Sequence, residues 1–529
     1  MTMDTFAPLM FAGLVFVLLI GFPVAFSLIA LGLSCGFFAV WMGWFPASFM
    51  TALPLNVFGI LSNDLLLAIP FFTLMGTILE RCGLAEDMLD SMGQLFGPVR
   101  GGLGYSVIIV GFILGAITGT VAGQVIAMAM ISLPVMMRWG YNMRYATGVL
   151  AASGTITQLV PPSLVLIVLA DQLGKPVGDM YKGAWGPALL QVALFALYTF
   201  ILSRIKPAHV PGVPKEGRTL DGWALWSKCL RGIVPSAVLI LTVLGSMGGL
   251  PGMKSAIATP TEAGAMGAVG AFILAAMHKR LNLAVLKQAL LNTMRITSMV
   301  VFILIGSRVF TLVFQGVDGG IWIEHLLAGL PGGQLGFLIA VNIFIFILAF
   351  FLDFFEIAFI VIPFLVPVAT KLGIDLIWFG VMICVNMQTS FMHPPFGFAL
   401  FYLRGISDTL FKNKSLPRKV ESRDIYMGAI PFIVIQLILV AVVIFFPQTV
   451  TVFLDKEKVL DLDKASEQIM QMGGGRNQAP TPSLDPMQGL TQPDAGASSA
   501  VGPGGSAAPA AEDPMEAVRR ALEQDKAKK

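Results

Sequence analysis

Within a long apolar segment, 144–170, residues 153–163 read SGTITQLVPPS. The two consecutive prolines remove two backbone donors and bias the residue before them toward an extended conformation, so a helix must unwind here. A second apolar segment, 376–402, contains a similar sequence, NMQTSFMHPPFG, at residues 386–397. Both segments are therefore predicted to be helices that are broken at a Pro-Pro pair.

The two breaks belong to an internal repeat. Comparing residue i with residue i+233 aligns Pro134 with Pro367, Gly140 with Gly373, Pro161 with Pro394 and Pro162 with Pro395. Pro23 and Pro260 align at an offset of 237 residues. An odd number of membrane crossings in each half would give the two copies opposite orientations, and inverted repeats with interrupted helices are typical of secondary transporters.

The composition places the whole chain in a membrane. The 529 residues are 56% hydrophobic and only 12% charged, with a net charge of +3, whereas soluble domains have roughly 25% charged residues. This excludes an ordinary soluble enzyme, a disordered protein and a nucleic-acid binder. The four cysteines and four histidines are scattered, without CxxC or HExxH spacing, so neither a disulfide framework nor a transition-metal site is expected. We expect an all-α polytopic membrane protein that is not an enzyme.

Two apolar stretches are too long for one crossing of about 20 residues. They are 103–137, with small and polar residues at 115–120, and 336–370, with Asp353 and Glu356 near its middle. We expect each to form a re-entrant helical hairpin with its polar tip near the middle of the membrane, buried in protein or facing a cavity. The other predicted spanning stretches are 7–44 (two passes, broken near Gly21–Pro23), 56–79, 185–204, 233–250, 258–277, 292–313 and 427–453.

Charge in the connecting segments predicts the orientation. The segments 204–231, 278–288 and 403–426 are basic and are expected in the cytoplasm, and 171–184 and 314–335 are expected outside, with both termini. The predicted organisation is a first inverted repeat at 1–205, a cytoplasmic linker at 206–231, a second repeat at 232–454 and a tail at 455–529. The tail is rich in Gly, Pro, Ala, Ser and Gln and is expected to be disordered.

Broken helices offer a chemical reason for transport. Freed carbonyls and half-helix C-termini can coordinate a cation, and half-helix N-termini attract an anion. Small oxygen-bearing side chains surround both breaks, and sodium, a hard cation, favours oxygen ligands. These hydroxyls could instead satisfy freed backbone groups.

At these residues the sequence resembles the large membrane subunit of TRAP (tripartite ATP-independent periplasmic) transporters, over roughly residues 5–453. The motifs that carry the resemblance are GFPVA at 21–25, AITGT at 116–120, Gly140-Tyr141, QLVPPS at 158–163, ATPTEA at 258–263 and HPPFG at 393–397. The resemblance implies an elevator-type, sodium-coupled importer in the bacterial inner membrane. It also implies a small four-helix membrane partner and a periplasmic binding protein that delivers an organic acid. His393 stands where the family usually has threonine, so it either titrates, with an ordinary pKa of about 6.5, or only lines the site.

We therefore expect two cation sites, one at each hairpin and its broken helix, with the substrate between them. The predicted cation-binding residues are Thr118, Gly119, Thr120, Ser153, Gly154, Thr155, Pro161, Asp353, Glu356, Asn386, Gln388, Thr389 and His393. The predicted substrate-binding residues are Gln158, Ser163, Ser390 and Arg308. No cofactor is expected besides Na⁺ as the coupling ion.

Some of these residues have a second interpretation. Asp353 and Glu356 could be merely solvated in a water-filled vestibule, and Arg308 could pair with an internal acid. Glu262 is expected to form a capping box with Thr259 at a helix start rather than a functional site. The alternative functions are a stand-alone dicarboxylate or cation symporter of related architecture and, with less support, a membrane-embedded enzyme or a channel.

Overall fold

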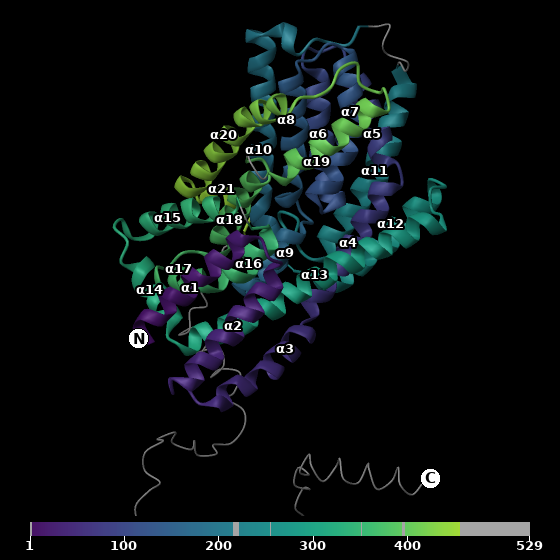
Figure 1. Cartoon of the computed structure of the whole chain (residues 1–529). Coiled ribbons are helices and arrows are strands. Elements are labelled where there is room, and N and C mark those ends of the chain that lie inside the picture. The colour runs from purple at the N-terminus through teal and green to yellow at the C-terminus, as the bar shows by residue number, and fades with distance from the viewer. Residues whose placement is uncertain (1–2, 215–221, 254, 351, 394–396, 455–529) are drawn as a thin grey trace, which may run out of the picture. The chain divides into compact units, whose positions relative to one another are not determined.

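The computed structural model describes residues 3–214, 222–253, 255–350, 352–393 and 397–454, and these residues form helices without any strand (Figure 1). The predicted disordered tail, 455–529, lies outside the described residues. The chain begins with α1 (Met3–Ile20) and α2 (Val24–Trp41), which are separated at Gly21–Pro23 as predicted. Gly21 has a positive φ of 86°, a conformation that glycine adopts without strain.

The rest of the first half contains the first hairpin and the first broken helix. We call α6 and α7 the first hairpin, and residues 153–163, from the end of α8 through η2 to the residue before α9, the first break. The elements in order are η1 (Ala47–Ala52), α3 (Leu53–Leu61), α4 (Asp64–Arg81), α5 (Leu84–Phe96), α6 (Gly102–Thr118), α7 (Val121–Arg138), α8 (Met143–Thr155), η2 (Ile156–Gln158), α9 (Leu164–Leu173), α10 (Val177–Ile205) and η3 (Pro207–His209).

The second half contains the second hairpin, formed by α15, α16 and α17, and the second break, residues 386–397, which begins in the last turn of α18 and ends before α19. Residues 394–396 of this break, which include its Pro-Pro pair, lie outside the described part. The elements are α11 (Gly222–Ser246), α12 (Pro260–Met277), α13 (Leu283–Gly316), α14 (Gly319–Ala328), α15 (Gly333–Leu348), α16 (Phe354–Ile360), α17 (Ile362–Lys371), α18 (Leu376–Ser390), α19 (Phe398–Lys412), α20 (Ser422–Phe445) and α21 (Gln448–Thr451).

Several elements differ in detail from the sequence-based expectation. The predicted single span 56–79 is broken between α3 and α4, which are bent by 46° relative to each other. Helix α11 begins at Gly222, so the second part of the predicted linker is helical, and the segment 314–335 contains the short helix α14. The returning arm of the second hairpin is bent by 53° between α16 and α17. Pro363 at the start of α17 explains this bend, because proline lacks the amide hydrogen that would continue the hydrogen-bond ladder of α16.

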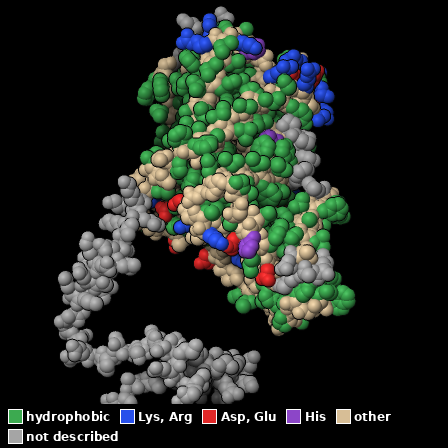
Figure 2. All heavy atoms as spheres, turned by 90° about the vertical axis from the view of Figure 1, so that its left-hand side faces the viewer, with side chains coloured by type: hydrophobic (Ala, Val, Ile, Leu, Met, Phe, Trp, Pro, Cys, Tyr) green, Lys and Arg blue, Asp and Glu red, His purple; other side chains and the backbone are tan. Residues whose placement is uncertain are grey.

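The structure has the properties of a multi-pass membrane protein. Seven helices of the described part are long and apolar enough to cross a bilayer, and the number rises to ten if three bent helix pairs each count as one span. A broad hydrophobic surface covers the face in Figure 2, whereas Lys and Arg side chains gather at its upper end. Exposed apolar side chains such as Phe16, Phe58 and Val269 are expected to contact lipid.

Glycines set several of the closest helix contacts. A Cβ atom on Gly306 of α13 would lie 2.7 Å from the carbonyl oxygen of Ala25 on α2. A Cβ atom on Gly148 of α8 would lie 2.1 Å from the carbonyl oxygen of Gly428 on α20. Small residues bring helix backbones together in membranes, where burial of apolar surface does not drive helices to associate.

Candidate functional site

The first break lies against a glycine-lined face of the first hairpin. A Cβ atom on Gly111 of α6 would lie 2.8 Å from Cβ of Ser153, and one on Gly115 would lie 3.2 Å from Cα of Thr157. These two glycines form a GxxxG pattern, which allows close backbone approach between helices. The hairpin ends its first arm at Thr118, and Gly119, with φ of 62°, makes the turn into Thr120 and α7.

Gln124, one turn after the hairpin tip, joins the first hairpin to the broken helix. Its amide nitrogen Nε2 donates to the carbonyl oxygens of Gly111 (2.6 Å) and Ser153 (2.8 Å). Its oxygen Oε1 accepts from Thr118 Oγ1 (3.2 Å) and from Thr157 Oγ1. Gln124 is fully buried. One amide therefore fixes the tip, the first arm and the broken helix relative to each other.

Most hydroxyl groups near the two breaks donate to backbone carbonyls. Thr155 donates to Ala152 (2.9 Å), Ser163 to Gln158 (2.5 Å), Thr389 to Asn386 (2.6 Å) and Ser390 to Met387 (2.5 Å). Ser163 also caps α9, because its oxygen accepts from the amide of Val165. These hydroxyls do satisfy backbone groups, but a hydroxyl that has donated its hydrogen still has lone pairs that can face a cation.

Several buried polar atoms at the first break have no hydrogen-bond partner among the described residues. They are the hydroxyl of Ser153 and both amide atoms of Gln158. The neighbouring Gly154 has a packing role, since a Cβ atom there would lie 2.2 Å from Cγ2 of Val125 on α7. Pro161 is buried and joined to Pro162 by a cis peptide bond. Buried polar atoms are nearly always paired, so unpaired ones at a helix break indicate a place for a ligand or water.

The second break contains a related set of amides. Asn386 Nδ2 donates to the carbonyl oxygen of Asn342 on α15 (2.8 Å), which joins α18 to the second hairpin. Among the described residues, the side-chain oxygen of Asn342 and the Nε2 atom of Gln388 find no partner. The predicted residues Asn386, Gln388, Thr389 and Ser390 are all buried here.

His393 lies in an aromatic environment. Its ring centroid is 4.1 Å from that of Phe346 and 4.9 Å from that of Phe350. Neither ring nitrogen hydrogen-bonds to a described residue. His393 is buried beside these two rings, and whether it titrates or only lines the site stays a prediction.

Asp353 and Glu356 form a capping box at the start of α16. The Asp353 carboxylate accepts from the amide of Phe354 (2.6 Å), and Glu356 Oε2 accepts from the amide of Asp353 (2.8 Å). Both side chains are half-buried. Their capping hydrogen bonds stabilise the tip of the second hairpin, and their carboxylate oxygens keep further lone pairs available. The predicted capping box of Thr259 and Glu262 at the start of α12 is confirmed.

The two breaks meet each other. Thr155 Oγ1 lies 3.9 Å from Sδ of Met392, and Cys384 Sγ on α18 lies 3.3 Å from the carbonyl oxygen of Gln158. Helix α9 packs against α18 and also against α16, which belongs to the second hairpin. These elements lie together near the middle of Figure 1. Residues separated by more than 200 positions therefore surround one region of the protein.

Two further glutamines connect the halves. Gln436 Nε2 on α20 donates to Thr155 Oγ1 (2.9 Å), and Gln191 Nε2 on α10 donates to Gln388 Oε1 (2.7 Å). All four side chains are buried. Thr155 and Gln388 are equivalent positions under the offset of 233 residues. The last long helix of each half is thus bonded to the broken helix of the other half.

One predicted residue is not joined to this region by any polar contact. Arg308 on α13 has an exposed side chain and forms no ion pair or hydrogen bond with a described residue. The pairing with an internal acid is therefore not found in the described part of the chain. Its substrate role stays a prediction.

Sequence reasoning missed four buried amides of this region, Gln124, Gln191, Asn342 and Gln436. A usable signal existed, because polar side chains inside apolar spanning segments are costly and tend to mark functional interiors. The glycine pair of α6 was a second missed signal. Among the described residues, no group of three or more His, Cys, Asp or Glu side chains converges as a metal site.

Comparisons with known proteins agree with this architecture. A family model described as tripartite ATP-independent periplasmic transporter, DctM component, matches residues 11–449. The C4-dicarboxylate TRAP transporter large permease protein DctM of Rhodobacter capsulatus is 30% identical over 418 residues, covering 76% of this chain and 90% of that protein. The 2,3-diketo-L-gulonate TRAP transporter large permease protein YiaN of Escherichia coli K12 is 26% identical over 432 residues, covering 82% and 95%. In fold, the chain is similar to the crystal structure of the Alcanivorax borkumensis YdaH transporter, with a TM-score of 0.51 at 14% identity. The similarity covers 76% of this chain and 88% of the YdaH chain.

Proposed function

Because the chain belongs to the DctM component family of tripartite ATP-independent periplasmic transporters, we propose that it imports a small organic acid anion across the bacterial inner membrane, driven by a sodium gradient. The observation that carries this proposal is the meeting of two helix breaks, each beside its own hairpin, around buried polar atoms that have no partner among the described residues. A secondary transporter needs such a midplane region, where cation and substrate bind together.

The proposed cation sites are the two hairpin-and-break assemblies. At the first, oxygen atoms of Thr118, Ser153 and Thr155 lie beside a helix end whose carbonyls have lost their helical partners. At the second, Asn386, Thr389 and the capping carboxylate of Asp353 supply oxygen atoms. Carboxylate, amide and hydroxyl oxygens suit a hard cation such as Na⁺.

The substrate is proposed to bind between the two assemblies. The unpaired amide of Gln158 offers a donor to a carboxylate oxygen, and the start of α9 at Ser163 presents its positive dipole end. Ser390 is the last residue of α18 and lies before the Pro-Pro pair of the second break. The relatives named for a C4-dicarboxylate and for 2,3-diketo-L-gulonate support a small organic anion as the class of substrate.

The chain is proposed to work with two partners, a smaller membrane subunit and a periplasmic binding protein that delivers the substrate. The description of the family as tripartite and periplasmic supports this, as do relatives named large permease proteins. We propose an elevator-type movement in which the hairpins and broken helices shift together. The bonds of Gln191 and Gln436 to the broken helices support including α10 and α20 in the moving unit.

Uptake by proteoliposomes tests the proposal. The chain is reconstituted with its small membrane partner and binding protein, and uptake of labelled C4-dicarboxylates and sugar acids is measured with an inward sodium gradient. Uptake is expected to fall to background when choline replaces sodium, and unchanged uptake would contradict sodium coupling. Uptake without the binding protein would favour the alternative function, a stand-alone symporter.

A further inference from the structure

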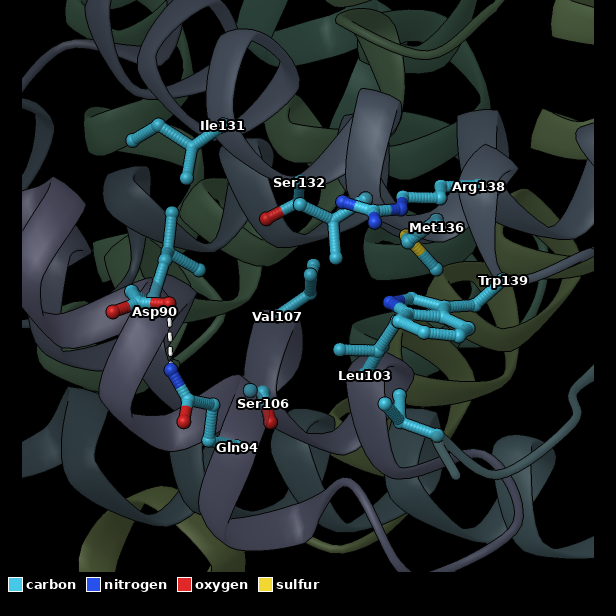
Figure 3. A pocket seen from close by; sticks show the side chains of 14 residues that line it. Asp90, Gln94, Leu103, Ser106, Val107, Ile131, Ser132, Met136, Arg138 and Trp139 are labelled. Carbon is cyan, nitrogen blue, oxygen red and sulfur yellow. Dashed lines mark hydrogen bonds between the residues drawn. The ribbon is translucent and has the colours of Figure 1, made fainter. Parts of the chain in front are cut away.

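A cavity of about 300 Å³ lies between α5 and the two arms of the first hairpin. Its apolar lining includes Leu89 from α5, Leu103 and Val107 from α6, and Ile131 and Val135 from α7. Figure 3 shows these helices around the cavity. None of its lining residues belongs to the hairpin tips or to the two breaks, so the candidate site described above does not explain it.

The polar side of this cavity carries a positive charge, and no acid in the described part of the chain pairs with it. In Figure 3 the guanidinium group of Arg138 and the indole nitrogen of Trp139 are turned toward the cavity. The Arg138 Cζ atom lies 5.5 Å from the centroid of the Trp139 ring, and neither group bonds to an acid or carbonyl among the described residues. Asp90 also lines the cavity, but Lys228 (2.5 Å) already compensates its charge, and Gln94 donates a hydrogen bond to it (3.0 Å).

The cavity lies at the basic end of the spanning helices. Loops from three parts of the chain meet there: the amide of Asn142 donates to the carbonyl of His209 (2.9 Å), and the amide of Gly101 to that of Val210 (2.9 Å). These loops are flanked by Arg100, Arg144, Arg204 and Lys206. Tryptophan is enriched at membrane–water interfaces, and basic pockets between spanning helices on the cytoplasmic side bind acidic lipid head groups.

We propose that this cavity binds one anionic phospholipid from the adjacent leaflet. The phosphodiester lies at Arg138 and Trp139, and part of an acyl chain fills the space among Leu89, Val107 and Ile131. A free inorganic anion would use the positive charge but leave the apolar lining unfilled, whereas the acyl chain of a lipid occupies the space between these apolar side chains. The bound lipid contacts both α5 and the hairpin, and so stabilises their packing.

Lipid retention tests this proposal. The purified chain is reconstituted in phosphatidylcholine vesicles that contain a minority of phosphatidylglycerol, and lipids that remain bound are counted by native mass spectrometry after gentle extraction. Arg138→Gln is expected to lower the retained phosphatidylglycerol about tenfold, the effect of losing a hydrogen bond to a charged group. Arg204→Gln is the matched control, because Arg204 is also exposed and lies over an aromatic ring, Phe200, but does not line the cavity.

A second variant tests the acyl part independently. Gly93 of α5 lines the cavity, and a Cβ atom there would meet only a side-chain atom, Leu103 Cδ2, at 3.4 Å. Gly93→Leu therefore directs an apolar side chain into the cavity. It is expected to reduce retention as strongly as Arg138→Gln. Equal phosphatidylglycerol retention by the Arg138→Gln chain and the unmodified chain would overturn the proposal. So would equal loss in Arg204→Gln, or full displacement of the lipid by glycerol phosphate alone.

Discussion

Substituting leucine for Gln124 removes the amide that joins the first hairpin to the first break while keeping the size of the side chain similar. Gln124 takes part in four hydrogen bonds, to Gly111, Ser153, Thr118 and Thr157. At about 0.5–1.5 kcal/mol for each bond, their loss lowers the free energy of unfolding by about 2–6 kcal/mol. The two hydroxyls and two carbonyls stay in the buried interface, so the hairpin tip is expected to separate from the break.

Thermal unfolding of the purified chain and sodium-driven uptake measure the two consequences of Gln124→Leu. We expect a clearly lower unfolding temperature. We also expect uptake to fall to a few per cent or less, which corresponds to a loss of about 2 kcal/mol or more in the free energy that supports transport. Gln334→Leu is the control, because Gln334 is exposed and makes a single hydrogen bond, to the carbonyl of Leu372, so its change is expected to stay within about 0.5 kcal/mol.

An isosteric change separates the donor from the acceptor contribution of Gln124. Glutamate keeps the oxygen that accepts from the two threonines but, when ionised, cannot donate to the carbonyls of Gly111 and Ser153. Gln124→Glu is therefore expected to be at least as damaging as Gln124→Leu. Stability and uptake that equal those of the unmodified chain in both variants would refute the assignment of Gln124 as the joining residue.

Three further predictions concern other contacts of the same region. Gly76→Ala on α4 places a methyl group 2.3 Å from the carbonyl oxygen of Thr118 at the first hairpin tip, and it is expected to lower the free energy of unfolding by about 1–3 kcal/mol. Gly59→Ala, where the added methyl would lie in open space, is the control in thermal unfolding and is expected to show no such loss. A double-mutant cycle of Gln436→Leu and Thr155→Val is expected to show a coupling of about 0.5–3 kcal/mol in unfolding, and additive effects would contradict the bond between them. Asp353→Asn is expected to keep the helix cap, whereas Asp353→Ala is expected to lower the free energy of unfolding by about 1 kcal/mol. If Asp353 also binds the cation, both variants raise the sodium concentration for half-maximal uptake. An unchanged concentration would limit the role of Asp353 to capping.

The helical layout was largely predictable because its signals are local. The break between α1 and α2 follows from Gly21–Pro23, and the first hairpin turns at Gly119, as its small residues indicated. The bend at Pro363 and the helical start of α11 at Gly222 were not predicted. Helix ends in apolar segments depend on packing against neighbours, and residue composition alone does not mark them.

The candidate site was predictable only in part. The sequence identified the hydroxyls beside each break, and the structure shows that Thr155, Ser163 and Thr389 donate to nearby carbonyls. It could not tell that the side chain of Arg308 is exposed and has no polar partner among the described residues. The direction of a side chain from a long helix depends on the rotation of that helix, which other helices set.

The sequence by itself determined that this protein crosses a membrane repeatedly and that two Pro-Pro pairs interrupt its helices. Both properties depend on neighbouring residues, because a span needs consecutive apolar side chains and proline removes its own amide hydrogen. Only the tertiary structure decided which buried amides meet. Gln124 reaches a carbonyl 29 residues away, Gln191 an amide 197 residues away and Gln436 a hydroxyl 281 residues away. A glutamine in an apolar helix must find a partner in the interior, but its neighbours in sequence do not specify which partner, because the packing of whole helices decides it.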